Sequence, residues 1–446
     1  MFAGQPPIIT DAAPYSAAFT KAVFMDTLGR TADPGAQAWF VQQLDAGAST
    51  ASVAPMLTNS TEYEVHLVQA AYQQYLGRDA EPAALAFWVN AVRTHIRDEQ
   101  LAAALVASDE FYSHAGGTNA AWVAAAYQAV LGRAATASDI QWATGLLASG
   151  VSRAALASDL AYSTEHEQQT VVSEFTRYLH AAPNSTDLNY WATQLTTGQQ
   201  TAESLVAELT GTNGYYEQHT GVPLSVVPVP FESPAWSAMN AQIENNAAHT
   251  NPDVVFLGDS ITQLWEQDGA AVWQQNYAGL NALDAGISGD RTQNLLWRIE
   301  NGDLNGISPQ VAVVMIGVNN IMLGDDAQSV AEGITSVVDE LHVRLPNTTI
   351  LLLGILPAQP PVPINAMPII KEANHSISAL ANGRSILYLD MGPSFTNSDG
   401  SIDSALYQPE LLHLNAAGYE TWAEAMTFEL SVVMASTESN PLWWRF

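Results

Sequence analysis

The stretch that decides the fold is residues 254–262, Val-Val-Phe-Leu-Gly-Asp-Ser-Ile-Thr. Four apolar residues run into Gly258, which indicates a buried strand followed by a tight turn. Similar apolar runs return along the second half of the chain, with amphipathic segments of helical period between them. The expected strands are 254–257, 281–285, 311–316, 349–353 and 386–390, and the expected helices are 293–300, 327–343, 366–380 and 416–430. This alternation predicts an α/β fold with a parallel sheet covered by helices on both faces.

Polar clusters follow several of these strands, at the edge where ligands bind in parallel sheets. They are Gly258-Asp259-Ser260, Gly286-Ile287-Ser288-Gly289, Gly317-Val318-Asn319-Asn320 and, just before the last helix, Glu410-Leu411-Leu412-His413. Taken one at a time, each cluster has a structural explanation, such as a helix cap, a turn or a core histidine. Taken together in this order, they predict a hydrolytic site.

Ester hydrolysis explains why these residue types belong together. A serine hydroxyl is a poor nucleophile at neutral pH and needs an adjacent base, the role we assign to His413. The tetrahedral oxyanion needs preorganised donors. The Ser260 N–H, the Gly289 N–H and the Asn319 side-chain amide are expected to supply them, and Gly289 can approach closely because it lacks a Cβ.

Four stretches carry a family resemblance: VVFLGDSITQLW, GISGDRTQNLLWRIENG, VVMIGVNN and LLHLNAAGY. They resemble the GDSL, or SGNH, hydrolases, and among these the catalytic subunits of platelet-activating-factor acetylhydrolase and their bacterial lysophospholipase- and acylesterase-like relatives. The resemblance covers about residues 236–432. It implies a flavodoxin-like three-layer α/β/α domain, and it places the family's Ser, Gly, Asn and His at Ser260, Gly289, Asn319 and His413.

The acid of the expected catalytic triad departs from the family pattern. The residue three positions before the histidine is usually Asp, and here it is Glu410. Three interpretations compete. Glu410 serves as the acid after a small local shift, which we favour, or a backbone carbonyl orients His413, or Asp403 substitutes from the preceding loop.

Two acidic residues beside the expected site receive structural roles. We expect Asp259 to brace the turn after the first strand, and Asp290 to form an ion pair with Arg291 that holds the second cluster. No His, Asp and Glu spacing suits a metal, and no glycine-rich phosphate loop or dinucleotide fingerprint appears, so no cofactor is expected.

The first half of the chain repeats itself with a period of about 50 residues. The motif occurs as Leu28-Gly29-Arg30, Leu76-Gly77-Arg78, Leu131-Gly132-Arg133 and, degenerate, Leu179-His180-Ala181, and the tryptophans that follow are Trp39, Trp88, Trp142 and Trp191. Each unit is expected to hold a helix capped by the left-handed glycine, a second helix with the tryptophan, and a third helix. The third helix carries Glu62-Tyr63, Glu110-Phe111 or Glu165-His166.

These features predict an all-α repeat domain over residues 15–216. We interpret the tryptophans as core anchors, with aromatic platforms for sugars as the alternative. The recurring arginine either pairs with an acid or caps the preceding helix. The region resembles a bacterial repeat domain of unknown function found in secreted calcium-repeat proteins and surface-layer-associated proteins. That resemblance implies export or surface display and no chemistry.

Two further segments complete the expected organisation. Residues 217–235 contain Pro223, Pro228, Pro230 and Pro234, a composition typical of a semi-rigid linker. Residues 433–446 follow the last helix as a C-terminal tail that contains Trp443-Trp444-Arg445-Phe446.

The amino-acid composition excludes several classes of binding partner and chemistry. Asp and Glu total 45 against 14 Lys and Arg, a formal charge of −31, which argues against nucleic-acid binding and against adsorption to anionic membranes. With no cysteine, disulfides and thiol nucleophiles are excluded. The apolar runs are too short to span a bilayer, and the first residues lack a secretory signal pattern. An acidic, lysine-poor, cysteine-free chain is typical of exported bacterial proteins, so we expect a secreted or cell-surface location, with the cytoplasm as the alternative.

The sequence therefore predicts a serine esterase that acts on a short acyl ester, an acetylated glycan or a lysolipid. Two alternatives stay open. One is a surface-attachment or carbohydrate-binding protein with a weak hydrolase domain. The other is an acyltransferase that uses the same site.

Overall fold

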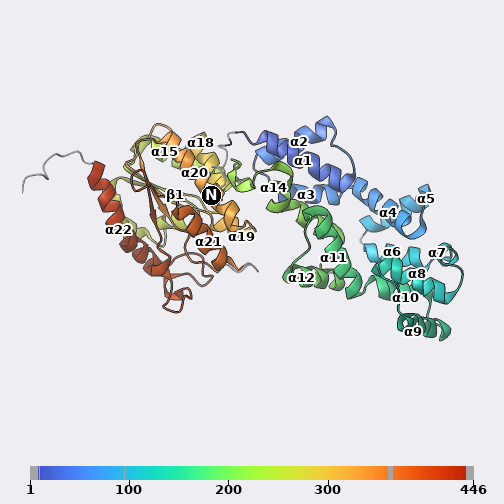
Figure 1. Ribbon diagram of the computed structural model, residues 1–446. Coiled ribbons are helices and arrows are strands. Elements are labelled where there is room, and N and C mark those ends of the chain that lie inside the picture. The colour runs from blue at the N-terminus through green and yellow to red at the C-terminus, as the bar shows by residue number, and fades with distance from the viewer. Residues whose placement is uncertain (1–8, 10, 95, 360–364, 438–446) are drawn as a thin grey trace, which may run out of the picture. The chain divides into compact units, whose positions relative to one another are not determined.

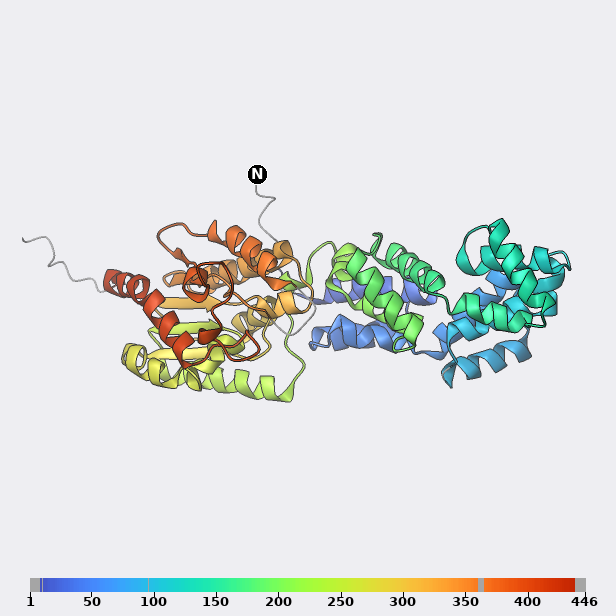
Figure 2. The same cartoon turned by 90° about the horizontal axis from the view of Figure 1, so that it is seen from below.

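The computed structural model describes residues 9, 11–94, 96–359 and 365–437. Contacts divide the chain into two compact units. The α/β unit runs from Thr220 onward and includes short pieces near the N-terminus, and the helical unit consists of Ala18–Ala38 and Ser49–His219. Figure 1 and Figure 2 show the elements of each.

A five-stranded parallel sheet forms the centre of the α/β unit, as predicted. Its strands stand in the order β2-β1-β3-β4-β5. The bounds are β1 Val254–Gly258, β2 Ala282–Gly286, β3 Val311–Met315, β4 Thr349–Leu353 and β5 Ile386–Leu389. All residues of β1 and β3 are buried, because helices cover both faces. The register pairs Gly258 with both Gly286 and Met315, so three strands end at one edge.

Helices flank the sheet in two layers. They are α15 Pro234–Thr250, α16 Ser260–Gln263, α17 Ala270–Asn276, α18 Thr292–Asn301, α19 Val318–Met322, α20 Ala327–Arg344, α21 Ala366–Ser378 and α22 Ala416–Thr437. Short 3-10 turns are η1 Leu224–Val226, η2 Leu264–Glu266, η3 Ala278–Leu280, η4 Gly392–Phe395 and η5 Ser404–Leu406. From β1 to β2 the chain moves across the sheet in one direction, and from β2 through β3 and β4 to β5 it moves in the opposite direction. Right-handed connections therefore place α17 on one face and α18, α20 and α21 on the other. The helices α18, α20 and α21 pack side by side, and α22 packs on α17.

Part of the segment 217–235, predicted to be a semi-rigid linker, packs against the α/β unit. Residues 224–229 are buried, and several polar contacts bind them to the α/β unit. The Ser225 hydroxyl donates to the Ser329 carbonyl at 2.6 Å, and the Asn294 amide donates to the Val229 carbonyl at 3.0 Å. The prolines do keep this stretch extended, but the valines between them gain more from burial against α18 and α20 than from exposure to water.

The expected tail begins inside a helix. Residues 433–437 complete α22, whereas 438–446, with Trp443-Trp444-Arg445-Phe446, lie outside the described residues. Within the described part of the chain, no helix combines the length and the apolar character needed to cross a membrane.

The described residues between 13 and 220 form what we call the helical part, of which residues 39–48 group by their contacts with the α/β unit. Its helices are α1 Ala13–Leu28, α2 Pro34–Asp45, α3 Thr50–Thr58, α4 Thr61–Leu76, α5 Pro82–Arg93, α6 Asp98–Ala107, α7 Asp109–His114, α8 Asn119–Leu131, α9 Ala137–Ala148, α10 Arg153–Ala161, α11 Thr164–Leu179, α12 Ser185–Thr197, α13 Ala202–Gly211 and α14 Asn213–Thr220. The expected left-handed caps are present: φ is +67° at Gly29, +69° at Gly77, +64° at Gly132 and +52° at His180.

The recurring arginine pairs with an acid, which decides between the two interpretations. Arg78 forms a bidentate contact with Glu110, 32 residues later, with Nε–Oε1 at 2.6 Å and Nη2–Oε2 at 2.8 Å. The Arg30–Glu62 and Arg133–Glu165 pairs have the same spacing. All three guanidinium groups also lie over an aromatic ring of the preceding helix, within 5.1–5.5 Å of its centre. The acids were expected on the third helix of each copy, but they lie in the first turn of the helix that follows it, namely α4, α7 and α11. Because these pairs are half exposed, each adds little stability, but the planar fork holds the start of that following helix against the cap.

The interpretation of the tryptophans as core anchors is wrong for Trp39 and Trp142, whereas Trp88 packs, partly buried, against the core of the helical part. Trp39 is 44% exposed and Trp142 is 55% exposed, while Trp88 and Trp191 are half-buried. The reason is rotation by about 100° per residue along a helix. The residues that turn inward in these helices are Phe40, Val89, Ala143 and Ala192, each next to a tryptophan in sequence.

The left-handed caps generate a stability prediction. A residue other than glycine costs roughly 1–2 kcal/mol in this conformation. We therefore expect His180→Gly to raise the free energy of unfolding of the helical part by about 1 kcal/mol, after the greater freedom of unfolded glycine is allowed for. Urea unfolding followed by far-ultraviolet circular dichroism measures it.

Gly77→Ala is the matched reverse change. No atom lies within 4 Å of the added Cβ, so only the backbone conformation opposes the methyl group. A loss of about 1 kcal/mol is expected. Equal stability of both variants and the natural chain would contradict the argument.

Candidate active site

Ser260 lies where β1 turns into α16. Gly258 is required there, because a Cβ would stand 2.5 Å from the Met315 carbonyl oxygen and 2.2 Å from the Thr262 hydroxyl. Asp259 caps α16: its carboxylate accepts the Ile261 N–H at 2.9 Å, which confirms the bracing role expected for it. The turn therefore holds the Ser260 hydroxyl at the carboxyl edge of the sheet.

The structure brings three of the predicted residues into one chain of hydrogen bonds. Ser260 Oγ lies 2.9 Å from His413 Nε2, and His413 Nδ1 lies 2.9 Å from Glu410 Oε1. Asp403 instead caps η5, since its carboxylate accepts the Ala405 N–H at 3.1 Å. Of the three interpretations for the acid, the geometry fits Glu410.

The electrostatics of Glu410 suit a charged partner for the imidazole. Slight burial raises the pKa of Glu410, but hydrogen bonds from its own backbone N–H and from His413 outweigh this effect, so the pKa lies below its usual value. The carboxylate is therefore ionised at neutral pH and can stabilise a positive charge on His413.

A strained turn carries the acid and the base. Leu411 has φ of +53°, a conformation that costs an L-residue roughly 1–2 kcal/mol. Two backbone bonds hold it: the Leu411 N–H donates to the Gln408 carbonyl at 3.0 Å, and the Gln408 N–H donates to the His413 carbonyl at 2.8 Å. Strain of this kind is typical of functional turns. The sequence does not predict this strain, because leucine rarely adopts a left-handed conformation and its presence at position 411 gives no sign of one.

The three expected oxyanion donors follow β1, β2 and β3. Gly289 has φ of +86°, and an added Cβ would meet only Phe231 at 3.7 Å, so backbone conformation is what requires glycine here. The Asn319 amide donates to the Asp290 carbonyl at 2.9 Å, which fixes its orientation and leaves its second N–H for a ligand. Among the described residues, the Ser260 and Gly289 N–H groups donate to no other group.

A buried ion pair lies behind this edge, and it is not the predicted one. Arg298 of α18, with no exposure to solvent, has its Nε 2.9 Å from Asp290 Oδ2 and its Nη1 2.6 Å from Asp303 Oδ2. Arg291 instead donates to Asn294 at 3.3 Å, at the start of its own helix. Arg291, the residue next to Asp290 in the sequence, points along the turn. Arg298, two helical turns later, points at the sheet and donates to the Ala285 carbonyl at 2.9 Å.

Asp290 receives a second donor from α15, where Trp236 Nε1 lies 2.6 Å from Asp290 Oδ1. Burial raises the pKa of Asp290 to about 6, and the charge of Arg298 and the Trp236 bond oppose the rise. The carboxylate is thus held in place on both oxygens, and its own backbone carbonyl holds the Asn319 amide.

Asn320 is a positioning residue that sequence reasoning missed. Fully buried, it accepts the Thr292 N–H at 2.9 Å and donates to Asp325 at 2.8 Å and to Gln293 at 3.0 Å. These bonds tie α19 to the start of α18, and so they orient the neighbouring Asn319. The signal available in the sequence was the doubled asparagine after β3.

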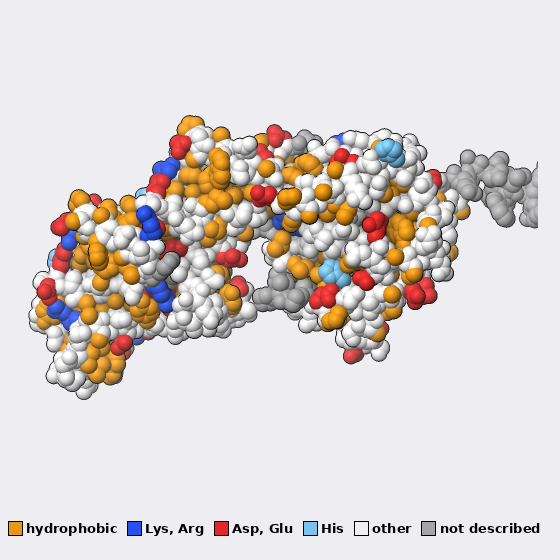
Figure 3. Space-filling model, turned by 180° about the vertical axis from the view of Figure 1, so that it is seen from behind, with side chains coloured by type: hydrophobic (Ala, Val, Ile, Leu, Met, Phe, Trp, Pro, Cys, Tyr) orange, Lys and Arg blue, Asp and Glu red, His pale blue; other side chains and the backbone are white. Residues whose placement is uncertain are grey.

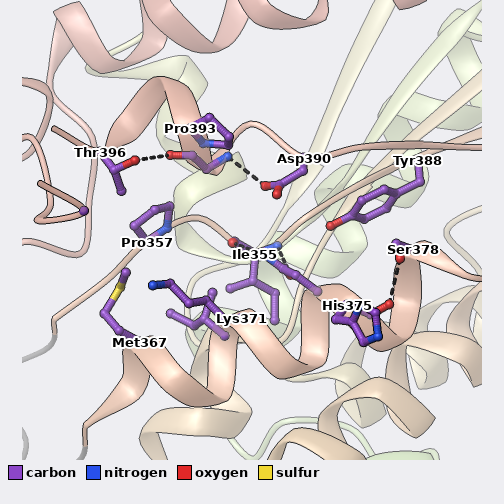
Figure 4. A pocket seen from close by; sticks show the side chains of 14 residues that line it. Ile355, Pro357, Met367, Lys371, His375, Ser378, Tyr388, Asp390, Pro393 and Thr396 are labelled. Carbon is purple, nitrogen blue, oxygen red and sulfur yellow. Dashed lines mark hydrogen bonds between the residues drawn. The ribbon is translucent and has the colours of Figure 1, made fainter. Parts of the chain in front are cut away.

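A separate hollow of about 500 Å³ lies between α21 and the segment after β5 (Figure 4). Its walls include Lys371, His375, Tyr388 and Asp390, and the Gly392 N–H donates to the Asp390 carboxylate at 2.9 Å. Burial raises the pKa of Tyr388. None of the five predicted site residues lines this hollow. Within the described ranges, no group of three or more His, Asp or Glu side chains is placed to hold a metal ion.

The parallel sheet and the serine, histidine and carboxylate at its carboxyl edge define the class of this protein as a hydrolase suited to acyl groups. Comparison with known proteins agrees. The GDSL-like Lipase/Acylhydrolase family matches residues 256–421, and a domain of unknown function, DUF4214, matches residues 102–170.

Two relatives show the extent of the similarity. The chain is 35% identical over 212 residues to human platelet-activating factor acetylhydrolase IB subunit alpha1, a match that covers 46% of this chain and 87% of the relative. It is also 35% identical over 187 residues to the rat alpha2 subunit, covering 41% and 78%. The chain belongs to the GDSL-like lipase/acylhydrolase family and is an enzyme that hydrolyses ester bonds.

A solved structure of a GDSL-like lipase from Bacteroides thetaiotaomicron aligns with 44% of this chain and 98% of its own length, at 19% identity and a TM-score of 0.37.

The buried ion pair generates a stability prediction. Arg298→Met leaves the carboxylates of Asp290 and Asp303 buried without their cation, and it should destabilise the α/β unit by about 3–5 kcal/mol. The control is Arg78→Met in the helical part, which removes a 37% exposed guanidinium whose partner Glu110 is 34% exposed, and it should cost less than about 1 kcal/mol. Urea unfolding followed by tryptophan fluorescence compares them, and equal losses would contradict the argument.

A pH prediction follows from the helix cap. Burial raises the pKa of Asp259 to about 7 from the ordinary 3.8; the Ile261 N–H opposes this rise, and the charge of Asp290 adds to it. Between these values the folded state keeps a proton that the unfolded state has lost, so the free energy of unfolding falls as pH rises from about 4 to 7.

Asp259→Asn keeps an oxygen for the cap but has no proton to lose. We expect this variant to show a shallower decline in unfolding free energy between pH 5 and pH 7.5, by up to about one linked proton. Urea titrations at several pH values measure the slope. An unchanged slope would show that Asp259 does not carry the proton.

Proposed function

We propose that this enzyme is a serine esterase in which Ser260 is the nucleophile. The observation that carries the proposal is the 2.9 Å contact between Ser260 Oγ and His413 Nε2, because a neutral imidazole at that distance can accept the hydroxyl proton during attack. Glu410, at 2.9 Å from the other ring nitrogen, orients the ring and stabilises the imidazolium that forms.

The reaction proceeds through an acyl-enzyme. Ser260 Oγ bonds to the ester carbonyl carbon while its proton passes to His413. The oxyanion accepts hydrogen bonds from the Ser260 N–H, the Gly289 N–H and the Asn319 amide. His413 then gives its proton to the leaving alcohol as the ester bond breaks. Water then attacks the acyl-enzyme carbonyl carbon while its proton passes to His413. As the bond between Ser260 Oγ and the acyl carbon breaks, His413 returns that proton to Ser260 Oγ and the acid is released.

We propose short acyl esters as the substrate class, with acetyl groups first. The support is that the mammalian relatives at 35% identity are named acetylhydrolases. An acetylated glycan or a lysolipid would present such an ester. The net charge of −31 disfavours strongly anionic substrates at long range.

The test is hydrolysis of p-nitrophenyl esters from acetate to long chains. Ser260→Ala should lower kcat by on the order of 10³-fold or more with the fold intact by circular dichroism, because the nucleophile is lost. The highest kcat/KM is expected on the acetate ester. Equal rates for the natural chain and Ser260→Ala on every ester would refute the assignment.

Variants of the acid separate the three interpretations within the same assay. Glu410→Ala should lower kcat by roughly 10²- to 10⁴-fold, whereas Asp403→Ala should leave it within about twofold. Activity that survives Glu410→Ala but falls with Asp403→Ala would move the acid to Asp403. Product analysis with an added alcohol acceptor distinguishes hydrolysis from acyl transfer.

A further inference from the structure

The helical part carries an aromatic residue at one recurring surface position that packing does not explain. Ten residues after each left-handed cap stands Trp39, Phe87, Trp142 or Tyr190, and their exposed fractions are 44%, 64%, 55% and 51%. On the face drawn in Figure 3, apolar side chains are spread among polar ones over this part of the molecule.

A position that served only the core would be buried. Here the next residue along the helix turns inward instead, as Phe40 and Ala143 do. A polar side chain at the exposed position would serve folding equally well and would avoid leaving a large ring in water. An exposed aromatic residue at this position in all four copies of the motif therefore indicates that the ring has a role other than folding, such as binding.

The structure shows what surrounds one of these rings. Trp142 lines a hollow of about 230 Å³, whose floor is apolar and includes Leu156 and Leu160. The polar wall consists of Arg133, Asp159, Ser163 and Glu165. A flat apolar ring beside a few polar groups is the usual make-up of a small-molecule site.

The polar wall is preorganised. Arg133 binds Glu165 through two hydrogen bonds and Asp139 through a third, at 2.9 Å, and its guanidinium lies 5.1 Å from the centre of the Tyr127 ring. The Glu165 carboxylate, 41% exposed, therefore points in a fixed direction with lone pairs to spare. The exposed carboxylate of Asp159 provides further acceptors on the same hollow.

These features match the chemistry of a sugar ring. A pyranose has a face of C–H groups, which stacks on an aromatic ring, and a rim of hydroxyl groups, which donate to carboxylates. The two carboxylates and the net charge of −31 disfavour an anionic ligand. A protein partner would need a continuous apolar centre, whereas this ring is bordered by charged groups.

We propose that the exposed aromatic residues of the helical part bind a neutral glycan chain, and that a sugar ring stacks on Trp142 with its hydroxyls on Asp159 and Glu165. This activity is independent of the esterase chemistry, since it uses none of the residues around Ser260. It assigns a binding role to the region that matches the domain of unknown function over residues 102–170.

The test uses the full chain with Ser260→Ala, so that binding is measured without hydrolysis. The probes are insoluble cellulose, chitin and curdlan, with polygalacturonate as the anionic comparison, and the fraction retained gives the affinity. We expect retention on at least one neutral polysaccharide. Adding Trp142→Ala should raise the Kd at least about tenfold, and changing Trp39, Phe87 and Tyr190 to alanine as well should abolish retention.

Two further variants make the result specific. Phe428→Ala removes an aromatic ring that is 70% exposed on α22, in the α/β unit, and should leave the Kd unchanged. Trp142→Tyr keeps a stacking ring and should retain most of the affinity, which separates loss of stacking from loss of folding.

Three results would overturn the proposal: no retention on any of the three neutral polysaccharides, a Kd that Trp142→Ala does not change, or stronger retention on polygalacturonate. None of these results bears on the esterase assay, because every protein in the binding test already lacks the nucleophile.

Discussion

The buried ion pair between Arg298 and Asp290 is the constraint on which the proposed active site depends. Neither charge is exposed to solvent, and a buried charge without a partner would cost several kcal/mol. Pairing them fixes α18 against the end of β2, and Trp236 adds α15 to the same carboxylate. The backbone carbonyl of Asp290 then holds the Asn319 amide, so the buried charge pair determines where the proposed oxyanion donor points.

The reactive groups themselves come from turns that are far apart in the chain. Parallel register brings the ends of β1, β2 and β3 to one edge, and so Ser260, Gly289 and Asn319 follow neighbouring strands. His413 and Glu410 arrive from the segment before α22, in a turn that stores strain at Leu411. A left-handed leucine is tolerated because backbone bonds over-determine the turn. The same bonds explain how glutamate, one methylene longer than the usual aspartate, meets the imidazole at 2.9 Å.

The helical part is organised by a different rule. Each left-handed cap ends a helix and places an arginine where its planar fork meets a glutamate 32 residues later, over an aromatic ring. These contacts join the cap of one copy to the first turn of the helix that follows its third helix, beside a core that includes Val106 and Trp122. The exposed ring ten residues after the cap lies outside that scheme, which is why it points to binding rather than to folding.

The sequence alone predicted the parallel sheet, strands within about one residue of those observed and the four copies of the motif. It also predicted Ser260, His413, Gly289 and Asn319 as site residues, and the structure places Ser260 Oγ 2.9 Å from His413 Nε2. These predictions follow from local hydrophobic period, glycine at tight turns, and the order of clusters at strand ends. Tertiary structure alone decided that Glu410 rather than Asp403 meets His413, that Asp290 pairs with Arg298 rather than Arg291, and that residues 224–229 pack on the α/β unit. It also decided that Trp142 faces solvent. The reason is that a side chain's partner depends on the rotation of about 100° per residue along a helix and on contacts between segments that are distant in sequence. Adjacent positions in the sequence do not reveal either of these.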